Sequence, residues 1–175
     1  SGTHKIGVGI DVGLVTNGVT SLSGLFSIAS YADRDAGDPT LFSRDGVVFT
    51  LTARHVQYLP GRRHYVWAGY QMDVTAADGR NFDAVSHAGS AGFSASLPWQ
   101  LSLEGSATIG NVRYVNYLPI PRRRSFLQVY AIQLKRQVTK NISIAVGYTH
   151  AFDKSNRALL KSRQNIVTLS TTIEF

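Results

Sequence analysis

Apolar residues alternate with small or polar residues along most of this chain. Between residues 5 and 14, every second residue is aliphatic, and the residues between are glycine, lysine or aspartate; the same alternation runs through 142–149 and 167–175. A helix would scatter the aliphatic residues around its circumference, whereas a strand places them on one face. The pattern predicts nine strands, near 5–15, 19–31, 47–59, 64–76, 84–97, 100–114, 125–138, 141–152 and 164–175. The strand at 125–138 is the least regular, because apolar residues fall on both of its faces.

The connections between these strands alternate in length. Segments 16–18, 60–63, 97–99 and 139–141 are short and place Gly, Pro or Asn where tight turns need them. Longer polar loops are expected at 32–46, 77–83, 116–124 and 153–163. Short turns on one side and long loops on the other are typical of bacterial outer-membrane barrels.

The residues that face away from the aliphatic side distinguish a membrane barrel from a soluble one. In residues 86–96 and 102–110 this other face consists of Ser, Ala, Gly and Thr with one glutamate. A water-exposed surface normally carries many more Lys and Glu side chains. A narrow barrel interior needs small side chains with a few charges. The sequence therefore predicts an all-β, antiparallel up-and-down transmembrane β-barrel, with about eight to ten strands in this chain.

Composition narrows the alternatives. The chain has 175 residues and is expected to form one domain over 1–175; it contains no cysteine, and 17% of its residues are charged. It has no apolar run long enough for a transmembrane helix. The net charge of +7 does not indicate nucleic-acid binding, because the basic residues gather in loop-like segments. No motif for a cofactor, a metal ion or a phosphate is present, so none is expected.

Aromatic residues fall near the predicted strand ends. Tyr58, Tyr65, Trp99 and Phe175 lie near the short turns, and Tyr31, Tyr114, Tyr117, Phe126 and Phe152 lie near the long loops. We expect them to form the two aromatic girdles of a membrane barrel.

The C-terminal residues carry a family resemblance. An alternating last strand that ends in Phe175 resembles the assembly signal of outer-membrane barrels, which implies recognition by the barrel assembly machinery. The series Ser155-Asn156, Arg163-Gln164-Asn165, Val167-x-Leu169 and Phe175 resembles the end of TPR-linked outer-membrane barrels, which include surface lipoprotein assembly modifiers and exopolysaccharide export porins. This resemblance covers about the last 25 residues. It implies a bacterial outer-membrane location, and an exported polymer or a lipoprotein as a partner.

Strand parity raises a further question. Single-chain bacterial barrels have an even number of strands, with both termini on the short-turn side. Nine strands that end on that side start among the long loops. The chain is then a fragment that lacks upstream strands, or a tenth strand lies within 32–46, or residues 5–15 lie outside an eight-stranded barrel. We favour the partial barrel.

Charged residues on the small-residue face are the first functional lead. They are Lys5, Asp11, Arg54, Asp73, Glu104, Lys135 and Glu174. A charge within a low-dielectric wall must be paired or hydrated. These residues either line a water-filled path and tune its selectivity, or form a salt-bridge network that plugs a narrow barrel.

Basic residues in the predicted long loops are the second lead. They are Arg122, Arg123, Arg124, Lys154, Arg157, Lys161 and Arg163. They could contact phosphates of outer-leaflet lipopolysaccharide or an acidic exported polymer. The alternative is ordinary solvated loop charge.

The chain contains five histidines, which raises the question of lipid hydrolysis. That reaction needs a serine, a histidine and an acidic or amide partner together. His87 and His150 project on the apolar face, but no serine shares that face within reach. Enzymatic activity is therefore not expected.

Four functional hypotheses follow. The leading one is a non-enzymatic pore or translocation scaffold in the outer membrane. A structural or adhesive barrel with a plugged lumen, acting through its basic outer loops, is the alternative. A lipid hydrolase comes third and a soluble ligand-binding barrel fourth.

Overall fold

The computed structural model describes residues 2–30, 45–116, 123–157 and 161–173. All nine predicted strands are confirmed, with ends that differ by a few residues from the expected ones. The strands are β1 (Gly2–Val15), β2 (Gly18–Ser30), β3 (Gly46–Tyr58), β4 (His64–Ala77), β5 (Ala84–Leu97), β6 (Leu101–Tyr114), β7 (Arg124–Gln137), β8 (Ile142–Ser155) and β9 (Ser162–Ile173).

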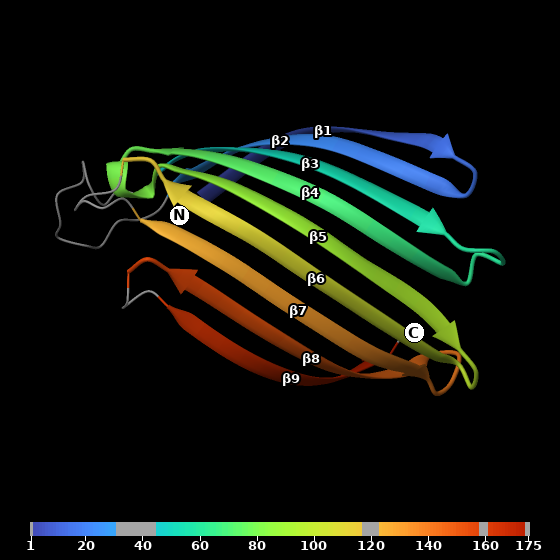
Figure 1. The fold of residues 1–175 in the computed structure, drawn as a ribbon. Coiled ribbons are helices and arrows are strands. Elements are labelled where there is room, and N and C mark those ends of the chain that lie inside the picture. Colours follow the sequence, from blue (N-terminus) through green and yellow to red (C-terminus); the bar gives the residue numbers. More distant parts are fainter. Residues whose placement is uncertain (1, 31–44, 117–122, 158–160, 174–175) are drawn as a thin grey trace.

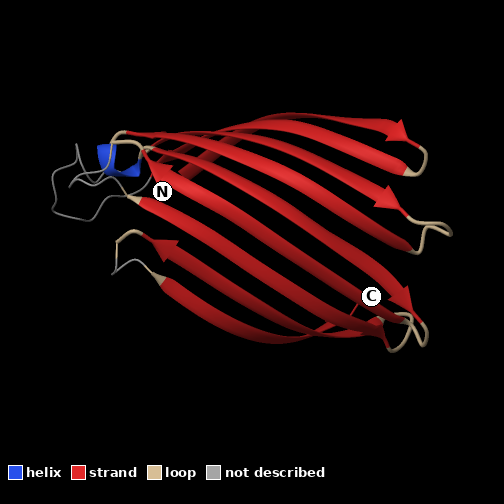
Figure 2. Cartoon of the chain, in the orientation of Figure 1, coloured by secondary structure: helices blue, strands red, loops and turns tan. Residues whose placement is uncertain are grey.

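The strands form one curved sheet in sequence order, and each strand is antiparallel to the next (Figures 1 and 2). The predicted all-β, up-and-down topology is therefore confirmed. Among the described residues, β1 pairs with β2 and β9 pairs with β8, so each of these two strands has one unpaired edge. Because the strands alternate in direction, β1 and β9 run the same way along the sheet.

The tight turns lie where the sequence places them. Asn17, Gly61 and Arg62 adopt positive φ angles of 62°, 80° and 53°, which close the first two turns of this side. Trp99 and Gln100 both have a φ of 59°, so the next turn extends one residue beyond the predicted segment. Because the strands alternate in direction, all four short connections lie at one end of the sheet, which we call the turn end (Figure 1).

The opposite end, which we call the loop end, carries the longer connections. The predicted loop at 77–83 contains a short 3-10 helix, η1 (Arg80–Phe82), which the period-two pattern did not predict. Most of 32–46 and residues 117–122 and 158–160 lie outside the described residues. Within the described part of the chain, no helix has both the length and the apolar character needed to cross a bilayer.

The two faces of the sheet differ sharply in exposure on the inner strand β8, whereas both faces of the edge strand β9 are exposed. On β8, Ser143 and Ala145 are 6% and 7% exposed, while Ile144 between them is 41% exposed. Ser27 and Ser125, which share the face of Ser143, are also buried. Small residues therefore lie on the enclosed, concave face of the curved sheet. The large apolar residues cover the convex face.

Candidate functional site on the concave face

The described residues among the charges predicted for the small-residue face all lie on the concave face, on strands from β1 to β7. Directly opposite residues of neighbouring strands share a face, so the register assigns each of them. Asp11 lies opposite Ser21, which lies opposite Arg54. The same reasoning places Lys5, Asp73, Glu104 and Lys135 on this face. Glu174 lies outside the described residues.

Among the described members of this set, Asp73 accepts the most side-chain hydrogen bonds. Its Oδ1 accepts a hydrogen bond of 2.7 Å from Thr50 Oγ1, and its Oδ2 accepts one of 2.8 Å from Ser86 Oγ. Gln71 Nε2 donates to both oxygens at 3.1 and 3.0 Å. These donors come from β3, β4 and β5 and all are neutral. The carboxylate is thus held in place across three strands without a neutralising cation among the described residues.

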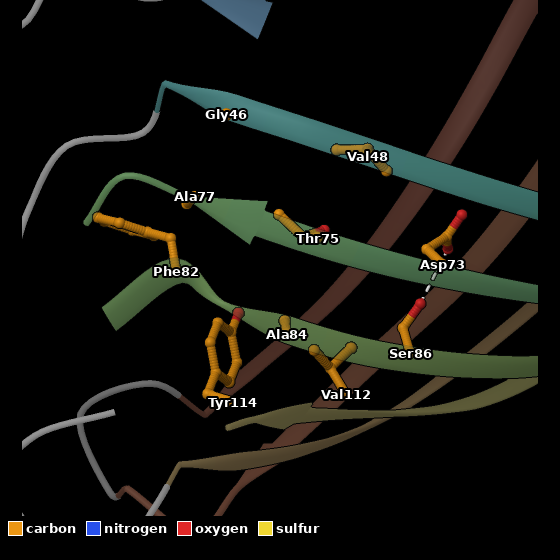
Figure 3. A pocket seen from close by; sticks show the side chains of 10 residues that line it. All are labelled: Gly46, Val48, Asp73, Thr75, Ala77, Phe82, Ala84, Ser86, Val112 and Tyr114. Atoms are coloured by element: carbon orange, nitrogen blue, oxygen red, sulfur yellow. Dashed lines mark hydrogen bonds between the residues drawn. The ribbon is translucent and has the colours of Figure 1, made fainter. Parts of the chain in front are cut away.

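A hollow of about 430 Å³ lies beside Asp73 at the loop end. Figure 3 shows Asp73 and Ser86 on one side of it, and Phe82 and Tyr114 toward the loop end. Val48 and Val112 supply aliphatic walls from β3 and β6. The hollow therefore combines one fixed carboxylate with hydroxyl, aliphatic and aromatic surfaces, which suits a polar or cationic solute.

The rim of this hollow carries a cation. The Arg123 guanidinium carbon lies 4.3 Å from the centroid of the Tyr114 ring, in a cation–π arrangement. Arg123 was predicted as an outer-loop anion ligand, but it stacks on a residue that lines the hollow. This contact was not predictable from the sequence, because the connection that joins Tyr114 to Arg123 has no periodic pattern of apolar residues.

A second hollow of about 250 Å³ lies nearer the turn end and is bordered by Arg54, Trp67, Glu104 and Gln133. The Arg54 guanidinium carbon lies 4.7 Å from the Trp67 ring centroid. Among the described residues, Arg54 and Glu104 form no ion pair with each other or with another member of the predicted concave set. Opposite charges therefore line this hollow, and the described side chains form no salt-bridge plug across it.

Three tyrosines predicted for the girdles are instead on the concave face. Tyr65 borders the second hollow together with Arg54. The Tyr58 ring packs against the Tyr65 ring, with the two ring centroids 5.8 Å apart. Tyr114 lines the first hollow. The prediction used position along the strand, whereas facing depends on the parity of each position. Tyr31, Tyr117 and Phe175 lie outside the described residues.

The convex face carries most of the exposed large apolar residues. Ile6, Val167 and Leu169 are 76%, 75% and 74% exposed. Toward the loop end this face becomes aromatic and polar, with Phe126 and Phe152 on β7 and β8 and with tyrosines that hydrogen-bond His or Asn. The convex face thus changes from aliphatic to amphipathic along its length.

Both histidines considered for hydrolysis lie on this face and have neutral partners. His87 Nδ1 is 2.6 Å from the Tyr70 hydroxyl, and His150 Nδ1 is 2.7 Å from Asn165 Oδ1. The Tyr130 ring stacks on His150 with centroids 6.5 Å apart. In the described part of the chain, neither ring has a serine as its hydrogen-bond partner. Nor do three His, Asp or Glu side chains there gather closely enough to hold a metal ion.

The basic residues of the predicted outer loops are less loop-like than expected. Arg124, Lys154 and Arg163 lie within β7, β8 and β9, because these strands extend further toward the loop end than their apolar alternation indicated. Arg157 and Lys161 lie in the connection between β8 and β9, and Arg122 is outside the described residues. Sequence reasoning missed Arg113, which lies directly opposite Arg124. Counting parity from Ile109 would have placed it on the convex face.

Comparisons of the chain with protein-family models, with curated proteins and with solved structures give no match.

Proposed function

We propose that this chain forms part of a transmembrane β-barrel in a bacterial outer membrane, whose concave face lines a path for a solute or an exported macromolecule. One observation carries the proposal, namely that most exposed large apolar side chains lie on the convex face, whereas the concave face carries mainly small side chains together with the strand carboxylates. A soluble sheet has the reverse arrangement, because apolar surface stabilises a fold when it leaves water. Monomeric soluble proteins rarely expose a contiguous apolar surface larger than a few hundred Å².

Strand length and connection length support the same proposal. The strands have 12 to 14 residues, whereas a tilted transmembrane strand needs about 9–11. They are long enough to cross a bilayer and extend beyond it at the loop end. Short turns at one end and longer connections at the other match the asymmetry of outer-membrane barrels.

Closure of such a barrel needs strands beyond the nine. β1 and β9 run in the same direction, so their direct pairing would be parallel. An all-antiparallel closed sheet has an even number of strands, so an odd number of further strands would lie between β9 and β1. Edge strands that avoid pairing are commonly blocked by proline, charge or a covering segment. β1 and β9 contain no proline, so their backbones can pair with further strands.

The concave charges give the path its chemistry. Asp73 supplies a fixed negative charge beside the larger hollow, while Arg54 and Glu104 place both signs at the smaller one. Such a lining passes polar solutes, and Asp73 favours cations at the loop end. The proposed partners are membrane lipid, the barrel assembly machinery and the transported polymer or lipoprotein.

The facing of β5 provides the test. Because the chain has no cysteine, Ser90→Cys and Ala91→Cys each give one labelling site, on the concave and convex faces of the same strand. In lipid vesicles, a fluorophore at residue 91 should be quenched by a nitroxide on the acyl chain, and one at residue 90 by aqueous iodide. Equal accessibility of both sites to iodide would overturn the proposal.

A conductance measurement tests the path itself. In a planar bilayer, Asp73→Asn should lower the cation-to-anion permeability ratio of the conducting protein. Asp78→Asn, which removes the same charge from an exposed position in the connection between β4 and β5, should change that ratio much less. If the protein inserts with the quenching pattern expected at residues 90 and 91 and still shows no conductance, that result would favour the structural or adhesive barrel.

A further inference from the structure

Four cations form a row across the convex face at the loop end. Arg113, Arg124, Lys154 and Arg163 lie one to a strand on β6, β7, β8 and β9, and all four are exposed. Arg113 lies directly opposite Arg124, and the register places Lys154 two positions from Arg124 and Arg163 two positions from Lys154, since Phe126 pairs with Lys154 and Phe152 with Arg163. We call this set the cation row.

Within the described strands, the row has no counter-charge on its own face. The carboxylates of the described strands, Asp11, Asp73, Glu104 and Asp153, all lie on the concave face. Like charges placed directly opposite each other, such as Arg113 and Arg124, destabilise a strand pair. The arrangement becomes favourable when an anion binds between them.

Main-chain contacts fix the centre of the row. Asn156 Oδ1 accepts a 2.9 Å hydrogen bond from Arg124 N, and Asn156 N donates to Arg124 O at 3.0 Å. The hydroxyl of Ser155, which is 2% exposed, donates to the same carbonyl at 3.3 Å. The start of β7 is therefore held to the end of β8, so less ordering is needed when a ligand binds.

A polar cluster lies next to the row, toward the middle of the sheet. Asn165 Oδ1 accepts a 3.0 Å hydrogen bond from the Tyr148 hydroxyl and lies 2.7 Å from His150 Nδ1. Since Asn165 Oδ1 is an acceptor, His150 Nδ1 carries the proton. The Asn165 amide nitrogen then remains a donor. Beyond this cluster come aliphatic residues of the same face, Leu134, Val146 and Leu169, which pair across β7, β8 and β9 and are 43%, 51% and 74% exposed.

From the loop end inward, the convex face thus presents cations, then amide, imidazole and phenol groups, then aliphatic surface. A phosphorylated lipid has the same sequence of chemistry: an anionic phosphate, a polar ester region and acyl chains. An acidic polysaccharide would match the cations but leave the polar and aliphatic zones without partners. The cations also lie on the convex face, on the side away from the concave path that a polymer would follow.

We propose that the convex face of β6–β9 at the loop end is a binding site for the phosphorylated headgroup of a bilayer lipid. The cation row binds the phosphate, and the Asn165 amide donates to the ester region. This site rests on the proposed membrane location of the convex face. It makes one sector of the barrel wall selective for anionic lipid.

Energy transfer to labelled lipids tests the site. A donor fluorophore is placed on Ile109→Cys, a convex position next to the row, or on Phe26→Cys, a convex position on β2 far from it. The protein is refolded into phosphatidylcholine vesicles that contain a trace of acceptor-labelled phosphatidic acid or acceptor-labelled phosphatidylcholine. Near residue 109, phosphatidic acid should be enriched over phosphatidylcholine by about tenfold, as expected for a few basic residues near a membrane surface. Near residue 26 the two acceptors should give equal transfer.

Charge-matched variants separate the row from general attraction. Replacing Arg124, Lys154 and Arg163 by Gln should remove the enrichment at residue 109. Replacing Arg63, Arg136 and Lys140 by Gln removes the same charge at the turn end and should leave the enrichment intact. Enrichment that survives the first triple variant, or that is equal at residues 26 and 109, would overturn the site.

Two competition arms identify the ligand, and one control isolates the membrane location. Inorganic phosphate and soluble polyglutamate, at matched ionic strength, should not displace the labelled lipid. Displacement by the first would indicate a site for free phosphate, and displacement by the second a site for acidic polymer; either result would overturn the lipid assignment. If neither donor transfers energy even to labelled phosphatidylcholine, the membrane location fails rather than the headgroup site.

Discussion

The two faces of this sheet are built from the same strands but carry different side chains, and on the inner strand β8 they also differ in exposure. On β8 the convex residues Ile144 and Val146 are 41% and 51% exposed, while the concave residues Ser143 and Ala145 are 6% and 7% exposed. On the edge strand β9 both faces are exposed. The four strand carboxylates are all concave, and the cation row is convex. Alternation of apolar residues alone gives the strands but does not say which face is enclosed. The size of the side chains on the second face carries that information, because the enclosed side of a curved sheet is filled largely by small residues, with a few large ones between them.

A lysine placed on either face gives the largest expected difference. Leu169→Lys and Ile144→Lys should lower the free energy of unfolding in lipid by roughly 2–4 kcal/mol, as expected for a cation at mid-bilayer depth. Thr168→Lys, on the concave face of β9, should cost much less, because its ammonium group can stay hydrated. Denaturant titrations of protein refolded in lipid vesicles measure both.

Adjacent positions on β9 make this comparison sharp, since Thr168 and Leu169 differ in facing but have nearly the same depth along the strand. A second concave control, Ser143→Lys, is less suitable than the sequence indicated, because Ser143 is buried and a long side chain there also causes overpacking. Equal losses at residues 168 and 169 would show that the convex face does not contact lipid.

The strands were predictable because each residue's neighbours along the chain decide the period-two pattern. The site was only partly predictable. The parity of Asp73 put it on the small-residue face, but its hydrogen bonds to Thr50 and Ser86 depend on the register of three strands, which alternation does not specify. The loop-end boundaries of β7 and β8 were missed for a different reason: Arg124 and Lys154 continue the strands with polar residues, so the apolar pattern ends before the strand does.

Two glycines of β5 give the next largest effect. A Cβ atom at Gly92, on the concave face, would lie 2.6 Å from the Gly105 carbonyl oxygen and 2.7 Å from the Trp67 ring, so Gly92→Ala should destabilise the protein by about 1–3 kcal/mol. A Cβ atom at Gly89, on the convex face, would meet nothing within 4 Å. Gly89→Ala should therefore be neutral or stabilise by up to about 1 kcal/mol, since alanine loses less backbone entropy than glycine on folding.

The same refolding titration measures both alanine variants. A further variant, Trp67→Leu combined with Gly92→Ala, separates the two contacts. If the ring is the main obstacle, the double variant should lose less stability than the sum of the two single changes. Equal effects of alanine at residues 89 and 92 would show that the enclosed face is not closely packed there.

The smallest expected effect concerns the two convex histidines, and it bears on whether this face does chemistry or only contacts lipid. A serine hydrolase needs the imidazole within hydrogen-bond reach of the nucleophile, with a third group orienting the ring. His150 has an orienting amide in Asn165, but the other residues next to it on the convex face are Tyr130, directly opposite on β7, and Tyr148 and Phe152 on its own strand, and none is a serine. His87 has only the Tyr70 hydroxyl as its hydrogen-bond partner among the described residues.

His87→Ala and His150→Ala should therefore each remove one exposed hydrogen bond, with a loss of stability of about 1 kcal/mol or less. Fatty-acid release from phospholipid vesicles should remain at the level of protein-free vesicles for the unmodified protein and for both variants. The two variants are each other's control, since a hydrolase would lose activity with one histidine and keep it with the other. Release of fatty acid by the unmodified protein that is abolished by His150→Ala alone would assign catalysis to the convex face, and a hydroxyl group from the undescribed residues would then have to complete the site.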